Sequence, residues 1–330
     1  MAIRYNPMIM GAGRRLIGAS YREFALEPEV AVRSIVAVQK FLLGTKKIPV
    51  SPCLDLSVEA ADFGQKMIYP EESTPHPDYN DPLIKTPDDY RKLQRIEFHK
   101  AKRMQGVLEM TRILNEREGY KGMVTGFCFG PLGVLGMMRG AERLFRDCLQ
   151  HREAVMKALE TVTEGLIEYV EGQCDCGATG VMLDTLFASW SGLGKRLWED
   201  VEGPFARELS RVVRRKGKAV ILHNCGHGPY FDSQIRTMEP VVISFAELPD
   251  DCKTRKDLKD RYGGQVYLMG HVSTKLLSYG TPHEVMEECR KQIDDLGAGG
   301  RYILAPACEF PPNAPLENAL ALVRAAEQYG

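Results

Sequence analysis

Short apolar runs alternate with longer amphipathic segments along most of this chain. Seven of these runs are apolar throughout and lack the polar–apolar alternation of a strand that has one face in water. Such runs are typical of parallel strands that are covered on both faces. We predict strands at Ile48–Ser51, Met123–Gly126, Gly180–Leu183, Ala219–Leu222, Val241–Phe245, Val266–Met269 and Tyr302–Ala305. The segments between them have helical periodicity, among them residues 88–119, and several end in glycine, which favours a helix C-terminus.

This alternation of strands and helices continues without a linker or a low-complexity break. It predicts an α/β fold of one domain, residues 1–330, in the form of a (β/α)₈ TIM barrel. Seven strands can be located and an eighth is assumed. Residues 1–45 are expected to form a helical extension that covers the bottom or the edge of the barrel.

Composition excludes several classes of function. Lys and Arg number 43 against 44 Asp and Glu, so no excess charge attracts nucleic acid or an anionic membrane. No run reaches the roughly 20 apolar residues that cross a bilayer, and the N-terminus lacks a signal-peptide pattern, so we expect a cytoplasmic protein. Nine cysteines, an odd number, indicate buried thiols, metal ligands or catalytic groups rather than a disulfide framework.

In a barrel of this kind, functional residues follow the C-terminal ends of the strands. Eight polar or thiol side chains stand there and are expected to meet at one mouth. They are Asp55, Cys128, Asp184, His223, Cys225, Glu247, His271 and Cys308.

Three of these side chains suggest a metal centre. His223 and Cys225 are two residues apart, so in an extended segment their side chains point to the same side. Cys308 follows a different strand and supplies a third donor. Two thiolates and an imidazole favour zinc, and three protein ligands leave one position open, as in catalytic zinc sites.

The ligand types also indicate a reaction. Two thiolates cancel the charge of a zinc ion, so an added thiolate keeps much of its nucleophilicity. The metal still lowers the pKa of an incoming thiol and supplies thiolate at neutral pH. This ligand set therefore favours alkyl transfer at sulfur over hydrolysis.

The segments "ILHNCGHG", "GTPHEVMEECRKQI" and "ILAPACEFPPNAPLENALALV" resemble the zinc-dependent, cobalamin-linked methyltransferases of the uroporphyrinogen decarboxylase superfamily, in particular the methylcobamide:coenzyme M branch. The resemblance implies a TIM barrel with His223, Cys225 and Cys308 as zinc ligands and Glu247 as an exchangeable fourth ligand. The family's usual "GN" after the sixth strand is replaced here by Gly270-His271, so the methyl donor or acceptor can differ.

Cobalamin, if it takes part, is expected on a partner. Neither a D-x-H-x-x-G corrinoid motif nor a G-x-G-x-x-G loop after a strand is present, so a separate corrinoid protein is expected to dock over the mouth. The loop "GFCFGPLGVLGMMRG" offers an apolar rim, with Cys128 expected to line the pocket. A homo-oligomer is possible.

Three alternatives stay open. The enzyme can instead take methyl from a small methoxylated or methylated compound, with Asp184 or His271 as the acid. It can be a decarboxylase, although "GAGRRLIGASYREF" lacks the order of that family's arginine-rich substrate loop. The zinc can also be structural, tying two strands together. Asp184 can equally cap a helix, and His271 can orient another group by a hydrogen bond.

Overall fold

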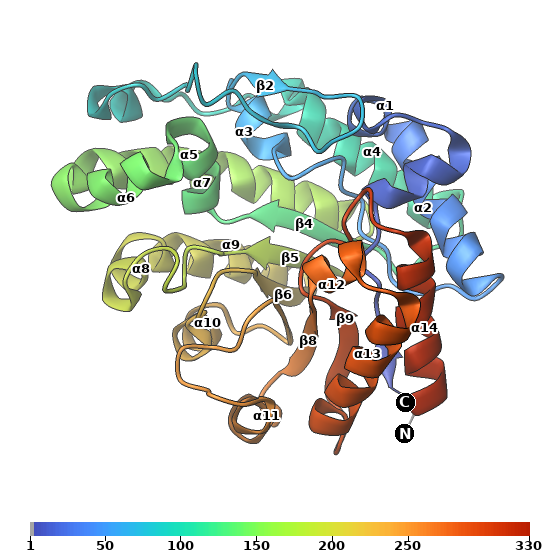
Figure 1. Cartoon of the computed structure of the whole chain (residues 1–330). Helices are drawn as coiled ribbons and strands as arrows, with labels where there is room; N and C mark the ends of the chain where they lie inside the picture. Colours follow the sequence, from blue (N-terminus) through green and yellow to red (C-terminus); the bar gives the residue numbers. More distant parts are fainter. Residues whose placement is uncertain (1–2) are drawn as a thin grey trace.

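The computed structural model describes residues 3–330, and its centre is a parallel sheet that curves into a TIM barrel with one unpaired boundary (Figure 1). Seven strands are hydrogen-bonded in the order β1-β9-β8-β7-β6-β5-β4, every pair parallel. They are β1 (Arg4–Tyr5), β4 (Thr125–Phe129), β5 (Gly180–Asp184), β6 (Ala219–Asn224), β7 (Val242–Phe245), β8 (Tyr267–Val272) and β9 (Tyr302–Pro306). A separate antiparallel pair is formed by β2 (Met67–Ile68) and β3 (His76–Pro77).

Helices surround this sheet. They are α1 (Tyr21–Leu26), α2 (Pro28–Leu43), α3 (Val58–Asp62), α4 (Lys102–Glu116), α5 (Pro131–Arg139), α6 (Ala141–Gln150), α7 (Arg152–Asp175), α8 (Lys195–Val201), α9 (Gly203–Arg215), α10 (Phe231–Met238), α11 (Arg255–Tyr262), α12 (Thr274–Tyr279), α13 (Pro282–Leu296) and α14 (Leu316–Tyr329). Short 3₁₀ helices are η1 (Gly11–Ile17), η2 (Pro87–Lys92) and η3 (Phe98–Lys100). None of the helices within residues 3–330 is both long and apolar enough to cross a membrane.

The eighth strand lies in the segment that was expected to be helical. β1 pairs with β9 through Arg4 opposite Ile303, so the helical extension begins only after it, with η1, α1 and α2. The predicted strand at residues 48–51 is reduced to one parallel bridge, between Val50 and Val124. Within residues 3–330 no sheet pairing joins β1 to Val50. We call this unpaired boundary of the barrel, between residues 3–10 and 46–56, the seam.

The long helix predicted over residues 88–119 is interrupted. The backbone of Leu93 is extended after η2, and α4 begins only at Lys102. The start of α4 is set from outside the helix, because the carboxylate of Asp62 accepts the N–H groups of Arg103 and Met104 at 3.2 and 2.8 Å. Hydrophobic periodicity alone cannot predict a helix start that is capped by a residue distant in the sequence.

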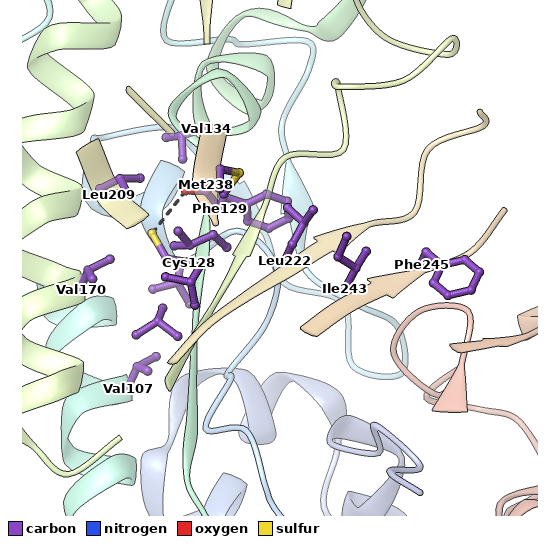
Figure 2. Close-up of a cluster of buried hydrophobic side chains, with 14 of the residues drawn as sticks. Val107, Cys128, Phe129, Val134, Val170, Leu209, Leu222, Met238, Ile243 and Phe245 are labelled. Carbon is purple, nitrogen blue, oxygen red and sulfur yellow. Dashed lines mark hydrogen bonds between the residues drawn. The ribbon is translucent and has the colours of Figure 1, made fainter. Parts of the chain in front are cut away.

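Cys128 belongs to the core between the sheet and the helices, not to the pocket. Figure 2 shows it among buried side chains that include Val107 of α4, Val170 of α7 and Leu209 of α9. Its thiol donates to the carbonyl oxygen of Phe129 at 3.3 Å. The expectation that Cys128 lines the pocket is wrong, because inward and outward residues alternate along β4 and Cys128 points outward.

Candidate metal centre

Three donor groups meet at the C-terminal end of the barrel. His223 is the penultimate residue of β6, Cys225 follows that strand directly, and Cys308 lies two residues after β9. Their ligand atoms all lie within 4.8 Å of one another. Strands β6 and β9 are not neighbours in the sheet, so closure of the barrel brings these side chains together.

The imidazole of His223 is held by a chain of hydrogen bonds. Its Nδ1 lies 3.0 Å from Ser244 Oγ, and Ser244 Oγ lies 3.7 Å from the sulfur of Met8. The serine hydroxyl can donate to Met8 while it accepts from Nδ1–H. This arrangement leaves the Nε2 lone pair of a neutral His223 free for a metal, in the way that ligating histidines are usually oriented.

Protons are shared unequally within the cluster. A hydrogen bond from Cys225 holds the pKa of the Cys308 thiol well below its usual range, and the same bond raises the pKa of Cys225. Burial lowers the pKa of His223, but its hydrogen bond to Cys308 and the charges of Asp184 and Cys308 outweigh burial and raise it to about 9. The cluster thus holds protons on Cys225 and His223 beside the Cys308 thiolate, and a bound dication would displace these protons.

This donor set fits zinc. Two sulfurs and one imidazole nitrogen are soft to intermediate donors, which zinc binds in tetrahedral sites, and three such donors leave one position for an exchangeable group. The orientation of His223 by Ser244 is consistent with the same assignment.

Asp184 lies beside this cluster. It ends β5, pairs in register with His223 and lines the same cavity. Its carboxylate accepts the N–H of Leu186 at 3.0 Å, which fixes a turn rather than a helix, because α8 begins only at Lys195. Burial raises the pKa of Asp184 to about 7; the positive charge of His223 opposes this increase. Such a carboxyl can hold or release a proton near neutral pH.

Glu247 and His271 lie elsewhere. Glu247 is exposed and is outside the group of donor atoms, so its role as a fourth ligand stays a prediction. The ring of His271 stacks on Phe245, and its Nε2 accepts a hydrogen bond from Arg255 Nε at 3.1 Å. Burial and the charge of Arg255 lower the pKa of His271 to about 4. His271 does not line the cavity, and its catalytic role also stays a prediction.

Asp55, the remaining polar candidate, and His227, which follows Cys225 closely in the sequence, have structural partners. Asp55 forms a buried ion pair with Arg103 and accepts from Ser57 N–H at 2.7 Å. His227 is exposed and packs edge-on against Trp190, with ring centroids 6.1 Å apart.

The sequence pattern missed Glu309. This residue follows Cys308 directly, lines the cavity and accepts the N–H of Gly11 at 3.2 Å. Burial, with added repulsion from Cys308, raises its pKa to about 8. A carboxyl beside a predicted thiol ligand in "PACEF" was a signal that could have identified it. Ser244, a lone hydroxyl in the apolar run "VVISF", was another.

The cluster opens into a cavity of about 690 Å³ inside the barrel. The walls are mainly aliphatic, aromatic and methionine side chains, with His223, Cys225, Cys308, Asp184 and Glu309 at one end. A cavity of this size accommodates a small organic molecule, and the donor groups converge on one part of it.

The model of the uroporphyrinogen decarboxylase (URO-D) family matches residues 10–329, which is nearly the whole chain. The protein belongs to this family. Its similarity extends to members of different activity. A methylcobamide:CoM methyltransferase (MtaA) of Methanosarcina barkeri is 23% identical over 95% of this chain and 88% of the relative. A uroporphyrinogen decarboxylase of Danio rerio is 25% identical over 77% of this chain and 69% of the relative.

Solved structures confirm the fold of this family member. A methyltransferase from Methanosarcina mazei superposes with a TM-score of 0.81 at 19% identity, covering 99% of this chain and 94% of that one. Because the family contains both methyltransferases and decarboxylases, the choice between these activities rests on the site itself.

Proposed function

We propose that this protein is a zinc-dependent methyltransferase that moves a methyl group from a methylcorrinoid, carried by a separate corrinoid protein, to a small thiol. The observation that carries the proposal is the convergence of His223, Cys225 and Cys308 within 4.8 Å at one end of the cavity. Similarity to methylcobamide:CoM methyltransferases over 95% of this chain supports it.

His223, Cys225 and Cys308 would hold the metal. When bound there, zinc would lower the pKa of a substrate thiol and keep it as a nucleophilic thiolate. Ser244 keeps Nε2 of His223 directed at the cluster. The cavity walls beside the reacting sulfur are mainly apolar.

The transfer balances without a further reactant. The thiol loses its proton to solvent, its sulfur forms a bond to the methyl carbon, and the cobalt–carbon bond breaks. Both electrons of that bond stay on cobalt, which goes from the trivalent to the monovalent state. No general base needs to act during the methyl transfer, because the proton leaves when the thiol binds.

The position of the N-terminal arginines favours methyl transfer over decarboxylation. Arg14 is fully buried and donates to the carbonyl oxygen of Pro312 at 2.9 Å and to Asn313 Oδ1 at 2.7 Å. Arg15 donates to the carbonyl oxygen of Ala314. Both side chains fasten the loop after Cys308, and neither lines the cavity, where a substrate with several carboxylates would need them.

Asp184 supports a second candidate function. If the substrate is a methyl ether or amine, its heteroatom must be protonated as it leaves, and Asp184 is a cavity-lining carboxyl whose pKa is about 7. The enzyme would then demethylate a small methoxylated or methylated compound and pass methyl to monovalent cobalt.

A panel of substrates distinguishes the two functions. Purified protein loaded with zinc is mixed anaerobically with methylcobalamin and thiols, and separately with monovalent cobalamin and methylated compounds. We expect methylcobalamin to be consumed with thiols. Absence of transfer in both directions, with zinc bound, would contradict corrinoid-linked methyl transfer.

A further inference from the structure

The cavity extends from the metal centre deep into the barrel. At the level of the cluster, Phe129, Asp184 and His223 are in register across β4, β5 and β6. Two residues earlier, Phe127, Met182 and Ile221 are in register and line the same cavity. Thr125, two residues earlier again, lines it as well. Four residues along a strand correspond to about 13 Å.

The seam explains why this space is open. The interior of a β/α barrel is normally filled by layers of side chains from all strands. Within residues 3–330, β1 and Val50 are not paired with each other, and Gly180 contributes no side chain at the level of Thr125. Residues from both sides of the seam, such as Ile3 and Ile48, therefore line the cavity instead of closing it.

The deep end of the cavity contains a polar group without a partner. Gln39 is 4% exposed, lines the cavity, and its Oε1 accepts no hydrogen bond within residues 3–330. It lies near the C-terminal end of α2, which is the side of the barrel where strands begin. A buried amide oxygen without a donor is costly, so a ligand donor would be stabilising there.

Two cations, Arg4 and Lys46, also line the cavity, and both side chains are exposed to solvent. Lys46 donates to the hydroxyl of Tyr5 at 2.7 Å and lies 3.5 Å from Glu327. The guanidinium of Arg4 stacks over Tyr267 at 5.3 Å. The buried polar group at the deep end is thus a neutral hydrogen-bond acceptor, whereas both cations remain in contact with solvent.

The metal end disfavours a short anionic substrate. Apart from His223, Cys225 and Cys308, the ionisable groups that line this end are the carboxyls of Asp184 and Glu309. An ionised carboxyl repels a sulfonate, and a neutral carboxyl can donate one hydrogen bond to it but supplies no opposite charge. The walls just beyond are apolar, formed by Phe127, Met182 and Ile221. A charge two carbons from the reacting sulfur would be desolvated there without a counterion.

We propose that the thiol substrate is elongated, uncharged and largely apolar, with a hydroxyl or amide at its far end that donates a hydrogen bond to Gln39. This inference rests on the proposed function and adds the substrate class to it. The sulfur lies at the metal centre, and the apolar chain follows the methionine and isoleucine side chains toward the seam.

Four thiols test the inference. They are 2-mercaptoethanesulfonate (coenzyme M), 2-mercaptoethanol, 1-hexanethiol and 6-mercaptohexan-1-ol. Each is titrated into zinc-loaded protein by calorimetry, and its methylation by methylcobalamin is followed separately. Each buried methylene is worth about fourfold in affinity, so four more should favour 6-mercaptohexan-1-ol over 2-mercaptoethanol by on the order of 100-fold. Tighter binding of 2-mercaptoethanesulfonate than of both six-carbon thiols would overturn the inference.

Two variants locate the chain and its far end. Val242→Phe places a large ring on the cavity wall and should abolish the gain in affinity with chain length. Val241→Phe makes the same change at the neighbouring residue, which is 48% exposed and outside the cavity, and should preserve the gain. Gln39→Leu should remove the preference for 6-mercaptohexan-1-ol over 1-hexanethiol. An unchanged preference in Gln39→Leu contradicts the assigned contact.

The two proposals fail in different ways. If the long thiols bind tightly but no thiol is methylated, the proposed function is wrong and the cavity still selects elongated ligands. If 2-mercaptoethanesulfonate is methylated most efficiently and binds most tightly, the proposed function stands and the inference about the substrate is wrong.

Discussion

Replacing Ser244 with alanine tests whether the metal centre depends on the orientation of His223. Ser244 is fully buried, and its Oγ is 3.0 Å from Nδ1 of His223, which is only 3% exposed. In Ser244→Ala no water reaches Nδ1 to replace the lost acceptor. A buried donor without a partner costs about 1–3 kcal/mol. The imidazole can avoid this cost by rotating, or by moving its proton to Nε2, and either change removes the metal-binding lone pair.

The expected result is a loss of zinc affinity of about 10- to 100-fold, the range found when partners of metal-bound histidines are removed. The assay is competition between protein and a chromogenic zinc chelator at fixed pH. Ser210→Ala is the matched control, because Ser210 is equally buried but lies on α9, where it donates to the carbonyl oxygen of Arg207. If Ser244→Ala binds zinc as tightly as Ser210→Ala, then Ser244 does not support a metal ligand and the orientation argument is refuted.

Three further predictions concern the ligands, the proton donor and a buried acid. Cys308→Ala should lose zinc but shift the unfolding temperature by only a few degrees, as metal analysis and calorimetry would show, because barrel packing supplies most of the stability. Asp184→Asn should slow methylation of a thiol less than about tenfold, whereas a loss of about 100-fold or more would favour acid-assisted demethylation. Glu202 accepts hydrogen bonds from Trp198 Nε1 and Leu132 N, and burial raises its pKa to about 7. Its stabilising contribution is therefore complete below the unfolded pKa of about 4.5 and is lost as pH rises through 7, by about 2 kcal/mol between pH 5.5 and 8.5. Asp184 and Glu309 titrate in the same range, so urea unfolding should show a loss that is smaller by about 2 kcal/mol in Glu202→Gln than in the native protein.

Local sequence was sufficient for most of the sheet, because parallel strands that are buried on both faces appear as short, continuous apolar runs. The runs predicted at Gly180–Leu183 and Tyr302–Ala305 correspond to β5 and β9 with one residue added to each. The pattern failed for β1, since two residues are too short for any periodicity. It also failed at residues 93–101, where the start of α4 is determined by Asp62, a residue distant in sequence.

The site could be predicted in part, because functional residues of a barrel follow the C-terminal ends of its strands. Positions after strand ends identified His223, Cys225 and Cys308, which the structure brings together. The pattern does not contain side-chain direction, so it grouped them with Cys128, Glu247 and His271, which do not line the cavity. The roles of Glu247 and His271 stay predictions. Gln39 belongs to helix α2 and lines the cavity, and this position follows only from the three-dimensional arrangement of the barrel.

Zinc titration of metal-free protein tests the central claim most directly. The protein is stripped with a chelator, mixed anaerobically with methylcobalamin and 6-mercaptohexan-1-ol, and the appearance of monovalent cobalamin is followed as zinc is added. We predict a rate that rises in proportion to zinc and levels off at about one zinc per chain, and that is absent in Cys225→Ala/Cys308→Ala at any zinc concentration. A rate that does not depend on zinc, or one that persists in the double variant, would contradict the assignment of His223, Cys225 and Cys308 as the centre of methyl transfer.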